Sequence, residues 1–144
     1  MEPNAKPTVA RLSESEKIVF GPDAHYNKLI GEAGMPIFTG IQTSQPGYAT
    51  PVHSHPYVEM LFIIEGTCEA WLDGHEDEAM RLEAGDMCAL PARKPHAFRV
   101  VGDKPMRLLG IHCSPKREVN FADGSATGEN GYQVLDEQLR PLKR

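Results

Sequence analysis

The sequence predicts an all-β domain, either a sandwich or a barrel. Short runs rich in β-branched, aromatic and other apolar residues recur along the chain, and Gly, Pro or Asp bounds each of them. Asp73-Gly74 suits a type I′ turn and predicts a hairpin that joins residues 67–72 to residues 75–82. Helical periodicity is scarce, so alternating β and α units are not expected.

The expected strands follow one another at short intervals. In chain order they are residues 17–20, 36–43, 59–66, 67–72, 80–86, 87–91, 96–103 and 106–113. Further turns are expected at Glu65-Gly66, Ala84-Gly85-Asp86 and Gly102-Asp103, because Gly and Asp tolerate the backbone conformations that tight turns need. These strands predict one β-barrel or sandwich domain over residues 17–115.

The two ends of the chain differ in composition from the predicted domain. Residues 1–16 are mostly polar and predict an N-terminal arm. After Pro115 the chain is polar and rich in Gly, so residues 116–144 predict a C-terminal arm. Within that arm, residues 132–140 could form a short helix, whose apolar face would consist of Val134, Leu135 and Leu139.

The composition argues against several classes of partner. A chain of 144 residues is the usual size of one domain, and its net charge of −5 disfavours binding to nucleic acid or to an anionic membrane. The N-terminus has no apolar stretch of signal-peptide length, and the apolar run at 60–64 is too short to span a bilayer. A cytoplasmic protein is therefore expected.

The cysteine pattern predicts thiols rather than disulfides. Cys68, Cys88 and Cys113 are odd in number, and none of them forms a C-x-x-C pair. Free cysteines are usually buried, so reduced and mostly buried side chains are expected at all three positions.

One stretch of the chain carries two histidines and a glutamate at suggestive spacing. His53 and His55 would share one face of a strand, about 7 Å apart. On a straight strand Glu59 would lie about 13 Å beyond His55, but Pro56 allows a break that returns Glu59 toward the histidines. A helix would also bring His55 and Glu59 together, although Pro51 and Pro56 disfavour it. The alternative without a site is two half-buried polar residues at a strand end.

A second segment supplies a fourth candidate ligand. Residues 85–98 place His96 at the start of a strand, after a loop bounded by prolines. Three neutral imidazoles and one carboxylate suit one divalent Fe, Mn, Ni, Co or Zn ion better than Ca²⁺ or Mg²⁺, which prefer oxygen ligands. An octahedral ion would keep two positions for water, O₂ or a substrate.

The two segments together resemble the cupin superfamily. Its first motif, G-x5-H-x-H-x3,4-E-x6-G, is matched in full by Gly47, His53, His55, Glu59 and Gly66. Its second motif, G-x5-P-x-G-x2-H-x3-N, is matched by Gly85, Pro91 and His96. The second motif departs at Arg93, which suggests a differently shaped turn, and at Val100. The resemblance implies a double-stranded β-helix, or jelly roll, with a metal held inside the barrel by three histidines and one glutamate.

Strand alternation predicts the wall of the barrel. Leu61 and Ile63 share the face of Glu59, and Phe98 and Val100 share the face of His96. The pocket is therefore expected to be apolar and to hold a small, partly apolar molecule.

Polar residues that could act in this pocket are few. His112 and Tyr57 are the candidate catalytic residues, His112 as a general acid or base. Weaker candidates for pocket contacts are Gln42, Tyr48, Arg93 and Lys94. His25 and His75 are expected at the surface, and Trp71 in the core or in an interface.

Three functions are compatible with these predictions. The favoured one is an Fe(II)-dependent dioxygenase, because oxygen chemistry needs no acid or base in the pocket and tolerates an apolar wall. The second is a metal-dependent isomerase, lyase or decarboxylase, in which the ion acts as a Lewis acid. The third is a binding protein without catalytic activity. Small cupins often pair, so a homodimer is also expected, with residues 17–20 as the candidate exchanged strand.

Overall fold

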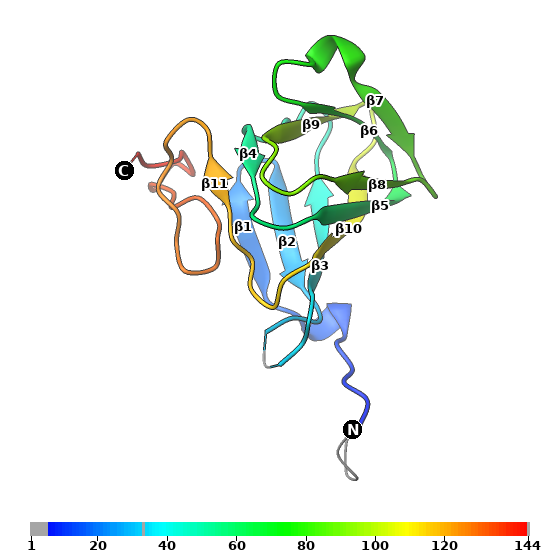
Figure 1. Ribbon diagram of the computed structural model, residues 1–144, viewed down its shortest axis with the longest axis vertical. Helices are drawn as coiled ribbons and strands as arrows, with labels where there is room; N and C mark the ends of the chain where they lie inside the picture. Colours follow the sequence, from blue (N-terminus) through cyan, green and yellow to red (C-terminus); the bar gives the residue numbers. More distant parts are fainter. Residues whose placement is uncertain (1–5, 33, 144) are drawn as a thin grey trace.

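The computed structural model describes residues 6–32 and 34–143, and in this part the protein consists almost entirely of β-strands (Figure 1). One sheet has the strand order β1 (Lys17–Gly21), β2 (Ala24–Lys28), β3 (Phe38–Ser44), β10 (Met106–His112), β5 (Glu59–Glu65) and β8 (Met87–Leu90). The other has the order β11 (Asn120–Phe121), β4 (His53–Ser54), β9 (His96–Val101), β6 (Thr67–Leu72) and β7 (Met80–Glu83). Two single-turn 3₁₀ helices, Leu12–Glu14 and Glu76–Glu78, lie outside the sheets.

Both sheets are antiparallel, and neighbours in a sheet are mostly distant in sequence. β10, for example, lies between β3 and β5 and pairs with both of them. β9 lies between β4 and β6 in the second sheet. Strands that alternate between two facing sheets in this way form a jelly roll. The predicted all-β class and the double-stranded β-helix are therefore confirmed.

The core fills the space between the two sheets. Ile63, Cys68 and Met106 are completely shielded from solvent, and Leu61, Phe98 and Leu108 are nearly so. These residues come from both sheets and occupy the inward positions of their strands, as period-two alternation requires. All three cysteines are free thiols; Cys68 and Cys88 are buried as expected, whereas Cys113 is exposed.

The hairpin predicted at Asp73-Gly74 forms with a longer loop. Gly74 takes the positive φ of +82° expected for a turn, but β7 begins only at Met80, which pairs with Ala70. The intervening Glu76–Glu78 forms a 3₁₀ turn instead of extending the strand. Three consecutive acidic residues have low β propensity, which explains why the predicted strand over 75–82 starts late.

The helix predicted over 132–140 is absent, and that prediction was wrong. The segment instead makes isolated β-bridges, Thr127 with Gln133 and Leu135 with Pro141. Leu139 adopts a positive φ of 60°, which interrupts a helix, and it remains more than a third exposed. The backbone groups of this segment form hydrogen bonds with the backbone of nearby residues of the same chain. A helix here would have no apolar surface to cover, so packing would not stabilise it.

The C-terminal segment packs against the barrel through a few buried residues. In Figure 1 it lies beside β11 and β1. Val119, Ser125 and Tyr132 are buried, although the surrounding residues are mostly exposed. At the other end, β1 begins at Lys17 and pairs with β2 of the same chain. The domain boundaries at 16/17 and 115/116, the homodimer and the cytoplasmic location stay predictions.

Within the described residues, the structure has no helix of the length and apolarity that crossing a bilayer requires.

Candidate metal centre

The four candidate ligands converge at one end of the barrel. His53 lies on β4, His55 follows it directly, and Glu59 and His96 are the first residues of β5 and β9. All four side chains are buried, and their potential ligand atoms lie within 4.8 Å of one another. His53 pairs directly with His96 across β4 and β9. The extended strand is interrupted between β4 and β5, as predicted around Pro56, and the turn there brings Glu59 back to the histidines.

The turn before His96 supports this arrangement. The backbone N–H of Arg93 donates to the carbonyl oxygen of His55 over 2.7 Å, which ties the two motif segments together. Arg93 has a φ of 63°, in the left-handed region that favours glycine. Arg93 therefore has a backbone conformation that the glycine of the family motif would adopt without strain, and the differently shaped turn stays a prediction.

Backbone carbonyls orient all three imidazole rings. Each Nδ1 lies within hydrogen-bonding distance of a carbonyl oxygen: His53 with Pro51 at 2.7 Å, His55 with Glu118 at 2.7 Å and His96 with Lys94 at 3.0 Å. A carbonyl only accepts, so each Nδ1 carries the proton and each Nε2 presents a lone pair. This hydrogen bond at the far nitrogen is typical of metal-binding histidines.

The inner nitrogens have no partner of their own among the described residues. His55 Nε2 and His96 Nε2 are shielded from solvent and form no hydrogen bond there. They lie 3.3 and 3.4 Å from Glu59 Oε1, so two lone pairs face a carboxylate oxygen. Such an arrangement is unfavourable without a cation, because every group in it is an electron donor. The residues therefore fit a bound divalent metal.

The charges of the cluster agree with this fit. Burial lowers the pKa of His53 to about 3, with His96 and His55 adding to the effect, so its ring is neutral at physiological pH. Burial opposes the ionisation of Glu59, but the neighbouring imidazoles, His112 foremost, outweigh it and hold its pKa well below the usual range. Neutral imidazoles and one carboxylate form a ligand set for Fe, Mn, Ni, Co or Zn.

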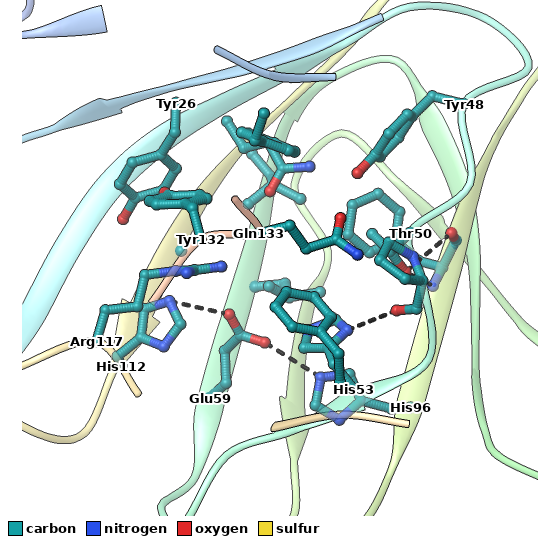
Figure 2. Close-up of a pocket in the computed structure, with 18 residues that line it drawn as sticks. Tyr26, Tyr48, Thr50, His53, Glu59, His96, His112, Arg117, Tyr132 and Gln133 are labelled. Carbon is teal, nitrogen blue, oxygen red and sulfur yellow. Dashed lines mark hydrogen bonds and ion pairs between the residues drawn. The ribbon is translucent and has the colours of Figure 1, made fainter. Parts of the chain in front are cut away.

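His112 and Tyr57 form a chain of contacts behind Glu59. The Tyr57 hydroxyl donates to His112 Nδ1 over 2.8 Å and accepts the backbone N–H of Glu118 over 3.0 Å. The proton of the neutral His112 ring is then on Nε2, which lies 3.1 Å from Glu59 Oε2 (Figure 2). Burial lowers the pKa of His112 to about 3. The geometry makes both residues positioning residues for Glu59, and a direct catalytic role for them stays a prediction.

A cavity opens beside the cluster, between the two sheets (Figure 2). Its volume is about 50 Å³, and because a cavity of roughly 10–15 Å³ holds one water molecule, it admits a small ligand. Six aromatic side chains contribute to its lining: Phe20, Tyr26, Tyr48, Phe98, Phe121 and Tyr132. Glu59, His53, His96 and His112 form its floor on the metal side.

Comparison with known proteins identifies the family. Residues 40–112, about half of the chain, match the family profile described as a cupin domain. The protein is a cupin. The matched region contains His53, His55, Glu59 and His96, and the predicted family resemblance is confirmed.

Two curated relatives resemble part of this chain. It is 36% identical over 76 residues to 5-nitrosalicylic acid 1,2-dioxygenase from a Bradyrhizobium species. The aligned residues cover 53% of this chain and 35% of the relative. It is 38% identical over 63 residues to dimethylsulfoniopropionate lyase DddQ from Ruegeria pomeroyi. The aligned residues cover 44% of this chain and 30% of the relative. The match thus spans about a third of each relative.

Solved structures agree on the fold. KdgF from a Halomonas species superposes with a TM-score of 0.66 at 18% identity, covering 78% of this chain and 96% of the other. The DddQ structure superposes with a TM-score of 0.65 at 24% identity, covering 76% of this chain and 62% of the other. The curated relatives are thus named as a dioxygenase and a lyase.

Of the remaining residues predicted to line the pocket, some line the cavity and others do not. Leu61, Phe98, Gln42 and Tyr48 line the cavity. Ile63 and Val100 are buried but lie two residues further along their strands, in the apolar core, and do not line it. The cavity occupies only the metal end of the barrel, whereas alternation alone predicts one continuous wall.

The loop and surface candidates lie outside the cavity. Arg93 and Lys94 are exposed and do not line it. His75 is exposed, and His25 is half-buried on β2. Trp71 is half-buried on the outer face of its sheet, beneath the guanidinium of Arg99 at 4.9 Å. It is therefore not in the core, and the alternative place in an interface stays a prediction.

Several lining residues were not predicted. Arg117, Phe121, Tyr132 and Gln133 come from the C-terminal segment, and Tyr26 comes from a strand that the sequence pattern did not reveal. The signal available in the sequence was weak: two aromatic residues, Phe121 and Tyr132, within an otherwise polar, Gly-rich stretch. Isolated aromatic residues of this kind usually pack against other apolar side chains.

Replacing His112 with leucine is expected to weaken metal binding about 10- to 100-fold while the stoichiometry at saturation stays at one ion. The substitution removes the N–H group that faces Glu59, and residues that orient a ligand typically contribute this much to metal affinity. Competition with a chelator of known affinity measures the change. Tyr57→Phe, which keeps His112 and loses only its support, should show a smaller loss. Equal affinity in His112→Leu and the unmodified protein would contradict the positioning role.

Proposed function

We infer that this cupin is a metal-dependent enzyme that acts on a small organic molecule in its barrel, and that its reaction is an Fe(II)-dependent dioxygenation. The observation that carries the inference is the buried three-histidine, one-glutamate cluster at the floor of an aromatic cavity. Fe(II), when bound, would supply the activation of O₂, whose two oxygen atoms would both enter the substrate. The residues of the chain hold the ligands, shape the cavity and exclude water.

The surroundings of the cluster support oxygen chemistry over proton abstraction. A lyase or an isomerase needs a base that can reach the substrate. Both ring nitrogens of His112 are engaged, one by Tyr57 and one by Glu59. Burial raises the pKa of Tyr26, Tyr48 and Tyr132 above their ordinary value, with Arg117 opposing it only in part, so these hydroxyls are poor bases at neutral pH.

A metal-dependent lyase is the second candidate function. The observation that favours it is the 38% identity over 63 residues with the lyase DddQ. In this alternative, Tyr57 or His112 would move on substrate binding to act as the acid or base. Both relatives are named for substrates that carry a carboxylate, and this defines the compounds worth testing first.

Oxygen consumption distinguishes the two functions. We expect the protein, loaded with Fe(II) under argon and then exposed to air, to consume one O₂ for each substrate converted when supplied with a panel of salicylates, phenolics, diketones and thiols. An oxygen electrode and chromatography of the products measure both quantities. The His96→Ala protein is the control for uptake by free iron. Absence of uptake across the panel, with conversion of dimethylsulfoniopropionate under argon, would instead support the lyase.

A further inference from the structure

The cavity contains a cation without a counter-charge. Arg117, just before β11, extends its guanidinium into the cavity beside His112 (Figure 2). Its Nη1 is shielded from solvent and has no hydrogen-bond partner, and no carboxylate among the described residues pairs with it. Glu59 is the one acidic side chain in the described lining, and it faces the imidazoles. Arg117 as a whole is half-buried, but the shielded side of its charge has no partner, and this arrangement favours an anionic ligand.

The guanidinium is held in place before any ligand arrives. It stacks on the ring of Tyr132, with 3.6 Å between its central carbon and the ring centroid. Gly131 allows the approach, because a Cβ at that position would lie 2.8 Å from the Arg117 carbonyl oxygen and 3.1 Å from Nη1. A planar fork fixed in this way matches a carboxylate with two parallel hydrogen bonds.

Two tyrosine hydroxyls in the same part of the cavity also lack partners. Tyr26 and Tyr132 are 3% and 5% exposed, and neither hydroxyl forms a hydrogen bond with a described residue. The Tyr26 ring lies directly over Gly40, where a Cβ would come within 2.3 Å of it, so the ring position depends on the absence of a side chain. Because burial raises the pKa of both tyrosines, the hydroxyls remain protonated donors.

We propose that Arg117, Tyr26 and Tyr132 form the binding site for a carboxylate of the substrate, with the reacting end of the same molecule directed at the metal cluster. In Figure 2 the three residues lie on one side of the cavity, and His53 and His96 lie on the opposite side. The proposal rests on the proposed function in assuming a small-molecule substrate, and it deepens it by naming the class: small organic carboxylates. Three unpartnered donors around one space are satisfied by a single carboxylate, which has four lone-pair positions.

Matched pairs of acids and amides test the proposal without any turnover. The protein is isolated with its own metal and kept under argon, and calorimetry measures its affinity for salicylate and salicylamide, benzoate and benzamide, and propionate and propionamide. We expect at least one acid to bind about tenfold or more tightly than its amide. If no acid binds more tightly than its amide, the proposal is wrong.

Substitution of Arg117 tests whether this residue contributes to the affinity for the carboxylate. Arg117→Gln should weaken binding of the preferred acid about 10- to 100-fold, since hydrogen bonds to charged groups contribute on this scale, and it should leave the amide unaffected. Arg81→Gln, a matched change at an exposed cation outside the cavity, should alter neither affinity. Unchanged acid affinity in Arg117→Gln would show that the carboxylate binds elsewhere, for example on the metal.

Removal of single hydroxyls keeps the test valid if Arg117→Gln does not fold. Tyr26→Phe and Tyr132→Phe keep the stacked rings and delete only unpartnered hydroxyls, so the thermal midpoint should not fall. Each should nevertheless weaken binding of the acid roughly fivefold. Loss of stability without loss of affinity would indicate a structural role and overturn the proposal. All of these readouts are independent of O₂, so a failed dioxygenase assay would not decide them.

Discussion

Replacing His96 with alanine is expected to remove the metal from the purified protein while the barrel stays folded. His96 is 2% exposed and directs an unpaired Nε2 at the cluster, where alanine offers no ligand. The remaining three ligands would form an incomplete coordination shell, so metal affinity should fall by orders of magnitude. Elemental analysis should then find well below one ion per chain. Circular dichroism should still report a β-rich protein.

The controls for this experiment come from the same chain. His75→Ala removes an exposed histidine that contacts only Glu78 in the described structure, and it should keep full metal content. His55→Ala should behave like His96→Ala, because its Nε2 is buried and unpartnered in the same way. Full metal content in both His55→Ala and His96→Ala would exclude the cluster as the metal site.

The second large effect is expected at Gly66, between β5 and β6. Gly66 has a φ of +81°, and a Cβ there would lie 2.5 Å from the Pro105 carbonyl oxygen and 2.7 Å from the Met106 Cα. Both contacts are with backbone, which cannot rotate aside. Left-handed strain and overpacking each cost about 1–3 kcal/mol, so Gly66→Ala should lower the free energy of unfolding by about 3 kcal/mol or more.

Gly74 provides the matched control for the close contact. It has nearly the same φ, +82°, but a Cβ there would have nothing within 4 Å. Gly74→Ala should therefore cost only the conformational strain, about 1 kcal/mol. Urea denaturation of both variants measures the difference, and equal losses would show that the contact with Pro105 and Met106 is relieved by movement of the chain.

The metal cluster was predictable because its determinants are local. Two histidines on one strand face, a proline break and a glutamate that opens the next strand all lie within seven residues, 53–59. His96 is distant in sequence, but it carries its own pattern of Gly and Pro at defined spacing. Strand alternation predicts a shared face for the two histidines, and the resemblance to the family motifs is what places all four residues inside one barrel.

The carboxylate-binding residues were not predictable by the same means. Arg117 and Tyr132 reach the cavity only because the C-terminal segment folds back over the barrel, where it buries Val119 and Ser125. A single arginine in a polar stretch looks like any solvated cation. The helix wrongly predicted over 132–140 rested on a weak apolar pattern, and the segment forms local β-bridges instead, Thr127 with Gln133 and Leu135 with Pro141.

The matched cupin region and the proposed carboxylate site are also separate along the chain. Residues 40–112 contain every candidate metal ligand, whereas Tyr26, Arg117 and Tyr132 all lie outside that range. If both proposals hold, the metal chemistry belongs to the shared part of the family, and the choice of substrate belongs to segments that this chain adds around it.

The hydrogen bond between His55 Nδ1 and the Glu118 carbonyl has a consequence for how the site matures. All four ligand residues are synthesised before Glu118, so a growing chain contains the complete ligand set before it contains the group that orients His55. By linkage, docking of the C-terminal segment and metal affinity must strengthen each other to the same extent. A chain that stops short of Glu118 is therefore expected to bind metal more weakly than one that contains it, although both carry all four ligand residues.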